Sequence, residues 1–128
     1  MITAMLDGDE DKTLEIIGDS HAAMVYGASK HAVTRAVRRR AAEYGAKGIT
    51  INVIAPGPTE TPMLQGVKDH PVISQSLNAI PIPKTRFARV DEMVDVIEFM
   101  LSDSAEYMQG SVIYVDGGTD AQVRPDAF

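Results

Sequence analysis

The chain has 128 residues, of which 45% are hydrophobic and 23% charged, a composition typical of one globular domain and not of a disordered segment. Its formal net charge of −6 argues against a nucleic-acid partner, and the absence of cysteine excludes disulfides and thiolate metal sites. No apolar run approaches the ~20 residues of a membrane span and the first residues lack a signal-peptide pattern, so we expect a cytoplasmic chain that does not contact membranes.

Residues 1–24 are acidic and mixed in pattern, which favours one or two short helices there. A clearer helix is predicted from Tyr26 to about Tyr44, because small apolar residues recur at helical spacing while arginines face away. Gly45 and Gly48 are expected to end this helix. Its apolar stripe consists of Ala28, Ala32, Val33, Ala36, Val37 and Ala41.

Two apolar runs, residues 49–55 (ITINVIA) and 111–115 (SVIYV), predict strands buried on both faces, as in a parallel sheet. Residues 62–89 are predicted as a loop with one short helix near 72–78, followed by a helix that Asp91 caps. Two strands cannot supply the neighbours that a parallel sheet needs. The pattern therefore predicts the C-terminal part of a doubly wound, Rossmann-type α/β sheet whose first half is absent. The buried face of the last helix is predicted to hold Met93, Val94, Val96, Ile97, Met100 and Leu101.

Tyr26 and Lys30 stand four positions apart, so one helix face presents both side chains. A free phenol titrates near pH ~10, too high for a base at neutral pH. An ammonium ~4 Å away contributes on the order of 4 kcal/mol at an effective dielectric constant of ~20, which favours the phenolate. The pair is therefore a candidate for proton transfer.

With Tyr26-Gly-Ala-Ser-Lys30, then Asn52-Val-Ile-Ala-Pro56-Gly57 and finally Val115-Asp-Gly-Gly118, residues 22–120 resemble the C-terminal half of a short-chain dehydrogenase/reductase. The acidic segment before Tyr26 and the C-terminal tail are similar to the bacterial 3α-hydroxysteroid dehydrogenase/carbonyl reductase branch.

The resemblance implies NAD(P)-dependent hydride transfer that interconverts a secondary alcohol and a ketone. Tyr26 would be the acid/base, and Lys30 would hold the nicotinamide ribose, so both would touch the NAD or NADP cofactor. The turn at Pro56 and Gly57 lets backbone approach the cofactor. Thr59 would offer backbone groups to the carboxamide, and Thr61 its hydroxyl to carboxamide or phosphate. The apolar segment 62–89 would cover a hydroxysteroid or another apolar carbonyl substrate.

The family's glycine-rich dinucleotide turn and its catalytic serine are expected to lie before Met1, since no such turn follows an apolar strand here. Thr13 and Ser20 are interpreted as capping and turn residues. Two positions depart from the family pattern. Thr85 stands where glycine commonly precedes the family's arginine, and Val90 stands where proline commonly begins a helix.

Two alternatives remain open: a non-catalytic truncated chain that acts as an association module, or one half of a split enzyme. We also expect a homo-oligomer paired through the last strand and the helix before it. The acidic segment 1–24 would obstruct pairing along the Tyr26 helix. We expect no metal site, because the three histidines share no ligand spacing with nearby acids. They are His21, His31 and His70.

Overall fold

The computed structural model describes residues 1–20, 22–71 and 73–127 and divides the chain into two compact units. The first comprises Met1–Val53 with Met108–Ser111, and the second Ile54–Tyr107 with Val112–Phe128. The interpretation of residues 1–128 as one partial domain stays a prediction. The elements run in the order α1 (Ile2–Asp7), α2 (Glu10–Ile17), α3 (Ala22–Gly45), β1 (Val53–Pro56), α4 (Pro62–Lys68), α5 (Ile73–Asn78), α6 (Val90–Leu101), the 3₁₀ turn η1 (Asp103–Ala105), β2 (Val112–Val115) and α7 (Thr119–Val123).

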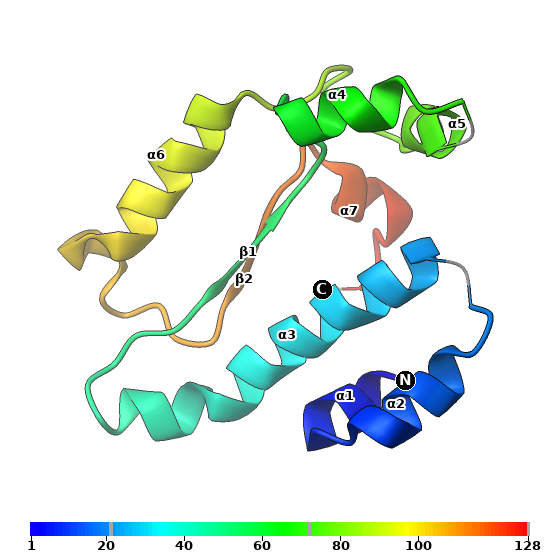
Figure 1. Ribbon diagram of the computed structural model, residues 1–128. Coiled ribbons are helices and arrows are strands. Elements are labelled where there is room, and N and C mark those ends of the chain that lie inside the picture. The colour runs from blue at the N-terminus through cyan, green and yellow to red at the C-terminus, as the bar shows by residue number, and fades with distance from the viewer. Residues whose placement is uncertain (21, 72, 128) are drawn as a thin grey trace. The chain divides into compact units, whose positions relative to one another are not determined.

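In the first unit, the short helices α1 and α2 form a pair beside the long helix α3 (Figure 1). Gly8 ends α1 in the left-handed conformation, at φ 71°, and the carboxylate of Asp9 caps α2 by accepting from the backbone N–H of Lys12 at 3.0 Å. Ala4 of α1 and Ala32 of α3 are both buried. The helical interpretation of residues 1–24 is confirmed for the residues that the structure describes.

Helix α3 ends at Gly45 as predicted, and it begins at Ala22, earlier than Tyr26. Most of its predicted apolar stripe is at least half-buried, but the side chain of Val33 is 56% exposed. The helices of the first unit therefore cover only part of the stripe.

The first predicted strand is too long, because β1 covers only Val53–Pro56 of the run that begins at Ile49. The residues before it are held by side-chain hydrogen bonds and by single backbone contacts, such as that from the N–H of Gly110 to the carbonyl of Ile51 at 2.8 Å, and not by a strand ladder. Gln109 Oε1 accepts from the N–H of Ile51 at 3.0 Å, and Asn52 Nδ2 donates to the carbonyl of Met108 at 2.8 Å. The Oδ1 of Asn52 also accepts from the backbone N–H of Ser111 at 2.9 Å, so this side chain satisfies two backbone groups.

Strands β1 and β2 lie side by side and parallel (Figure 1). The N–H of Val53 donates to the carbonyl of Ser111 at 2.9 Å, and four residues later the N–H of Gly57 donates to the carbonyl of Val115 at 3.0 Å. Both bonds join residues at the same sequence offset, which is the register of parallel strands. The α/β class and the parallel pairing are therefore confirmed.

Residues 62–89 contain two helices, α4 and α5, where the sequence predicted one. Proline at the first position of a helix gives up no hydrogen bond, so Pro62 begins α4 instead of breaking it. The hydroxyl of Thr61 caps the helix by accepting from the N–H of Leu64 at 3.2 Å. The second helix, Ile73–Asn78, matches the predicted one except at residue 72, which lies outside the described residues.

Helix α6 begins at Val90 with Arg89 as its N-cap residue, so the prediction that Asp91 caps it is wrong. The carboxylate of Glu92, at the third helical position, accepts from the N–H of Arg89 instead. The predicted buried face is also wrong, since no residue of α6 is buried. Two short strands offer too little area to cover a twelve-residue apolar helix. Helix α7, after the glycine turn, was not predicted at all.

Candidate active site

Tyr26 and Lys30 lie on the same face of α3, in the first unit. The Nζ of Lys30 is 5.4 Å from the centroid of the Tyr26 ring, so the ammonium stands over the face of the ring. The side chain of Tyr26 is 66% exposed, and no hydrogen bond to its hydroxyl is formed within the described part of the chain. Both polar ends can therefore be reached from solvent.

The two hydroxyls before this pair have local structural roles. Thr13 Oγ1 donates to the carbonyl of Asp9 at 2.7 Å inside α2. The N–H of Ser20 donates to the carbonyl of Ile17 at 2.7 Å, in the turn that follows α2. Ser20 is thus a turn residue, as interpreted, whereas Thr13 lies inside α2 and caps no helix, because Asp9 is the N-cap residue.

Pro56 and Gly57 end β1, in the second unit, where the backbone runs close to the end of β2. A Cβ built on Gly57 would lie 2.7 Å from Cα of Asp116, closer than real Cβ contacts. Only glycine fits this approach without moving backbone. The residue type at Gly57 is thus set by its contact with Asp116, the residue after β2, whatever ligand the loop holds.

Thr59 leaves its own backbone groups without a protein partner among the described residues. It forms a parallel bridge with Ala88, and the two hydrogen bonds of this bridge join Ala88 to the residues on either side of Thr59. Ala88 donates to the carbonyl of Pro58 at 2.9 Å and accepts from the N–H of Glu60 at 2.8 Å. In a parallel bridge the central residue turns its own N–H and C=O to the opposite side. That donor and acceptor pair suits an amide such as a carboxamide.

Thr61 caps α4 through its hydroxyl oxygen, which accepts from Leu64. A hydroxyl that accepts one hydrogen bond can still donate its own hydrogen. Thr61 can therefore serve as cap and as donor to a carboxamide or phosphate oxygen at once. Thr59 and Thr61 fit a nicotinamide cofactor on these grounds.

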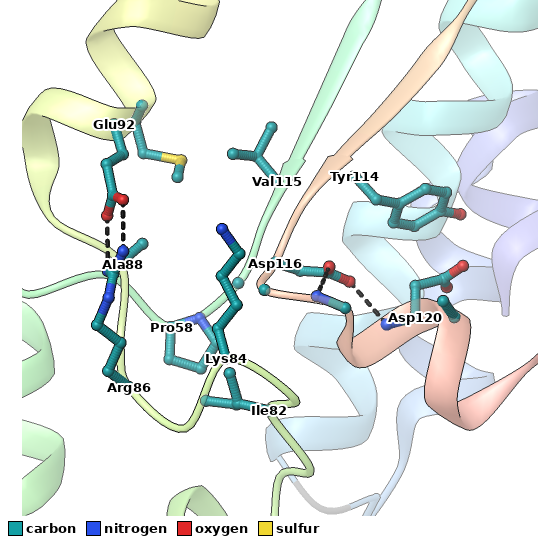
Figure 2. A pocket seen from close by; sticks show the side chains of 15 residues that line it. Pro58, Ile82, Lys84, Arg86, Ala88, Glu92, Tyr114, Val115, Asp116 and Asp120 are labelled. Carbon is teal, nitrogen blue, oxygen red and sulfur yellow. Dashed lines mark hydrogen bonds and ion pairs between the residues drawn. The ribbon is translucent and has the colours of Figure 1, made fainter.

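The second unit holds a cavity of about 560 Å³ beside Gly57 and Pro58 (Figure 2). Its floor is the turn after β2, in which the carboxylate of Asp116 accepts from the N–H of Gly118 at 2.9 Å and of Asp120 at 2.7 Å. This DGG turn stands out in the sequence as a motif, but the sequence does not indicate that it lines a cavity. The other lining residues are Ile82, Lys84, Arg86, Ala88, Glu92, Met93, Tyr114, Val115, Gly117 and Ala121.

Arg86 and Glu92 form a two-pronged ion pair at one side of this cavity (Figure 2). Arg86 Nη2 is 2.6 Å from Glu92 Oε1, and Nη1 is 2.8 Å from Oε2. The hydrogen bond from Arg86, followed by that from the N–H of Arg89, lowers the pKa of Glu92 from 4.5 to about 2. The same pairing raises the pKa of Arg86. This pair joins the segment before α6 to its first turn.

A second hollow of about 430 Å³ lies within segment 62–89 and the residues beside it. Leu77, Ile80, Ile82 and Phe87 supply apolar walls. The Nζ of Lys68 is 4.8 Å from the ring centroid of Phe87, and it also binds Glu60 at 2.8 Å. The segment predicted to cover a substrate thus has a hollow of its own.

Within residues 1–20, 22–71 and 73–127, no group of three or more acidic or histidine side chains is arranged to hold a metal ion. None of the helices in these ranges is both long and apolar enough to cross a bilayer.

The chain is similar to known dehydrogenases over most of its length. The profile of a family described as enoyl-(acyl carrier protein) reductase matches residues 14–120. The 3-alpha-hydroxysteroid dehydrogenase/carbonyl reductase of Comamonas testosteroni is 41% identical over 98% of this chain and 50% of its own length. The levodione reductase of Leifsonia aquatica is 37% identical over 75% of this chain and 38% of its own.

Solved structures give the same result. The 3-alpha-hydroxysteroid dehydrogenase of Pseudomonas sp. B-0831, complexed with NADH, superposes with a TM-score of 0.92 at 37% identity, over 99% of this chain and 50% of that one. The chain spans about half the length of the first relatives that it matches, which agrees with half of a Rossmann-type sheet. The resemblance drawn from the three sequence motifs is confirmed. This chain belongs to the short-chain dehydrogenase/reductase family.

Proposed function

We propose that this chain carries the acid–base and nicotinamide-binding half of an NAD(P)-dependent oxidoreductase that interconverts a secondary alcohol and a ketone. The observation that carries the proposal is the Tyr26–Lys30 pair on α3, with an exposed phenol whose hydroxyl has no protein partner among the described residues. A general acid or base must be within hydrogen-bond reach of substrate. The exposure of Tyr26 supports this role, because a substrate can approach its hydroxyl from solvent.

Tyr26 accepts the alcohol proton in oxidation and returns it to the carbonyl oxygen in reduction. Lys30 stabilises the phenolate that accepts this proton in oxidation and that remains after reduction, because its positive charge stands over the ring. The bound dinucleotide supplies the hydride chemistry. Lys30 also binds the nicotinamide ribose, while Thr59 and Thr61 orient the carboxamide through the groups that their local contacts leave available.

We propose an apolar substrate of the hydroxysteroid kind. Support comes from the apolar walls of the hollow in segment 62–89 and from relatives named for 3-alpha-hydroxysteroids and levodione. The lack of cysteine suits a reducing compartment, so we place the protein in the cytoplasm, to be checked by cell fractionation.

The test is a chimera in which this chain replaces the matching half of the Comamonas testosteroni relative. We expect NAD(P)-dependent oxidation of a 3α-hydroxysteroid. Tyr26→Phe should lower kcat by at least about 10², the low end of acid–base contributions, with little change in cofactor affinity. Lys30→Ala should lower both kcat and cofactor affinity. Near-full turnover of the Tyr26→Phe chimera would show that the phenol is only a packing residue.

A second candidate is a chain that acts through association, as a subunit-pairing module or as one half of a split enzyme. It is favoured by a row of exposed apolar side chains on α6, at the spacing of one helix face. Val90 is 51% exposed, Val94 43%, Ile97 44% and Leu101 82%. We propose that a second copy covers this row, so that the homo-oligomer pairs through α6 and β2. Cross-links that join two α3 helices instead would contradict it.

A further inference from the structure

The 560 Å³ cavity has a size and lining suited to a small apolar ligand. Ligand pockets are typically ~300–1,000 Å³ and mostly apolar, with a few polar groups that fix orientation. All its lining residues belong to the second unit. Its apolar lining consists of Pro58, Ile82, Ala88, Met93, Val115 and Ala121.

Every acidic side chain at this cavity already has a partner. Glu92 binds Arg86, and Asp116 accepts from two backbone N–H groups of the DGG turn. Asp120 accepts from Arg124 Nε at 2.9 Å. That contact and a hydrogen bond to the hydroxyl of Tyr114 raise the pKa of Arg124. The lining therefore offers no free anion among the described residues.

Among the charged residues that line the cavity, Lys84 alone has no partner for its charge within the described chain. Its ammonium makes no ion pair or hydrogen bond within the described chain, and Figure 2 shows its side chain extending between Ala88 and Val115. The backbone beneath it is fixed, because the N–H of Lys84 donates to the carbonyl of Gly117 at 3.1 Å. Its stem packs on Gly117, where an added Cβ would lie 3.4 Å from Cβ of Lys84. The ammonium of Lys84 is thus an unpaired cation at an apolar cavity, on a segment whose backbone is fixed by hydrogen bonding.

We propose that this cavity binds an amphipathic carboxylate, a compact hydrocarbon body that ends in one carboxyl group. The hydrocarbon packs against Ile82, Met93 and Val115, and the carboxylate binds the ammonium of Lys84. A charge-assisted hydrogen bond is about twice as strong as a neutral one, so the charged end sets the preference over the matching alcohol. The apolar lining supplies affinity to both ligands through the area removed from water.

The test uses octanoate and 1-octanol, titrated below their aggregation and solubility limits into the 128-residue chain without any dinucleotide. Affinity is measured by calorimetry, and the ε-methyl NMR signal of Met93 reports the location. We expect octanoate to bind at least about tenfold more tightly than octanol and to shift the Met93 signal. Lys84→Met should weaken octanoate about tenfold and leave octanol within about twofold.

Two further variants separate charge from shape. Lys84→Arg keeps the charge and should keep the preference for octanoate. Lys12→Met removes an exposed lysine of the first unit and should change nothing. Equal affinity for the two ligands, an unmoved Met93 signal, or full octanoate affinity in Lys84→Met would each overturn the assignment. Because no dinucleotide is used, these failures would leave the proposed oxidoreductase function untouched.

Discussion

Thr85 holds a backbone conformation that β-branched residues rarely adopt, with φ at 56°. Left-handed backbone costs an L-residue roughly 1–2 kcal/mol, and glycine avoids that cost. The sequence comparison with the family already set this position apart, since glycine is common there. The structure supplies the physical reason for the family's preference, a left-handed turn before Arg86.

Thr85→Gly should therefore stabilise the chain. The relieved strain exceeds the added backbone entropy of glycine, which costs roughly 0.5–1 kcal/mol, so we expect a net gain of about 1 kcal/mol or less in urea unfolding. Thr50→Gly is the matched control, because Thr50 is exposed and lies outside helix and strand without a positive φ. It should lose stability. A loss in both variants would mean that the turn at Thr85 is unstrained.

Glu92 should make the folded state sensitive to acid. Arg86 and the N–H of Arg89 lower its pKa from 4.5 to about 2, so the folded state favours the carboxylate. The resulting stability is fully present above pH 4.5 and is lost as pH falls toward 2. The pair is partly exposed, so the contribution is small and salt-sensitive.

Thermal unfolding of Glu92→Gln, compared with the unchanged chain, checks this expectation. The difference in Tm should be constant above pH 4.5 and should shrink between pH 4.5 and about 2. The control is Glu98→Gln, which removes an exposed carboxylate from the same helix. Among the described residues, Glu98 forms no ion pair. A Glu92→Gln difference that persisted unchanged at the acid end would refute the role of the ion pair.

At the scale of elements, α6 is the helix whose environment least matches its sequence. The row Val90, Val94, Ile97 and Leu101 repeats at intervals of four, three and four, and all four side chains are exposed. A row of this kind on one helix is the pattern by which two helices pack. Met93 stands three positions after Val90 and four before Ile97, so it borders this row, and it is half-buried at the cavity.

Leu101→Glu should weaken self-association, because it places a charge on the most exposed residue of the proposed contact. Sedimentation velocity should show a smaller species than the unchanged chain gives at equal concentration. Leu14→Glu is the control, since Leu14 is a 58% exposed leucine on α2 in the first unit. If both variants sediment like the unchanged chain, pairing through α6 is wrong.

The same elements show what the sequence can and cannot predict. Helix α3 was predictable because its apolar residues repeat at helical spacing over about four turns, from Ala28 to Ala41. The strand near Ile49 was predicted too long, because a β-branched run does not reveal that Gln109 and Asn52 bind its first half. Helix α4 was missed because residues 62–89 were interpreted as a loop with one short helix, although a proline such as Pro62 also begins helices.

The candidate site divides in the same way. Tyr26, Lys30, Gly57, Thr59 and Thr61 were found because motifs at fixed spacing carry them, and their roles stay predictions. The cavity at Lys84 had no local signal, since it forms where residues far apart in sequence meet. Contacts such as that between Lys84 and Gly117 are created by the fold and leave no periodic trace.

At the scale of the whole molecule, the 128 residues bury very little. Only five hydrophobic residues in the described ranges are buried, and only the small Ala105, at 1%, is less than 2% exposed among them. They are Ala4, Ala32, Leu64, Leu77 and Ala105. Strands β1 and β2 pair only with each other among the described residues, so each has an edge with open hydrogen-bonding groups. Open edges and exposed apolar surface both favour association.

The isolated 128-residue chain should therefore self-associate and fail to bind dinucleotide. Pyrophosphate binds at a glycine-rich turn that leads from a strand into a helix N-terminus, and no such turn occurs in this sequence. The contacts proposed above reach only the nicotinamide end of the cofactor, through Tyr26, Lys30, Thr59 and Thr61. Most of the cofactor would therefore stay in water. We expect no turnover and no heat of binding at millimolar NAD or NADP, and an oligomer in sedimentation. An N-terminal half supplied in trans should restore binding. Saturable micromolar binding of NADH to a monomeric chain would contradict both expectations, because it would require a phosphate site among residues that show none.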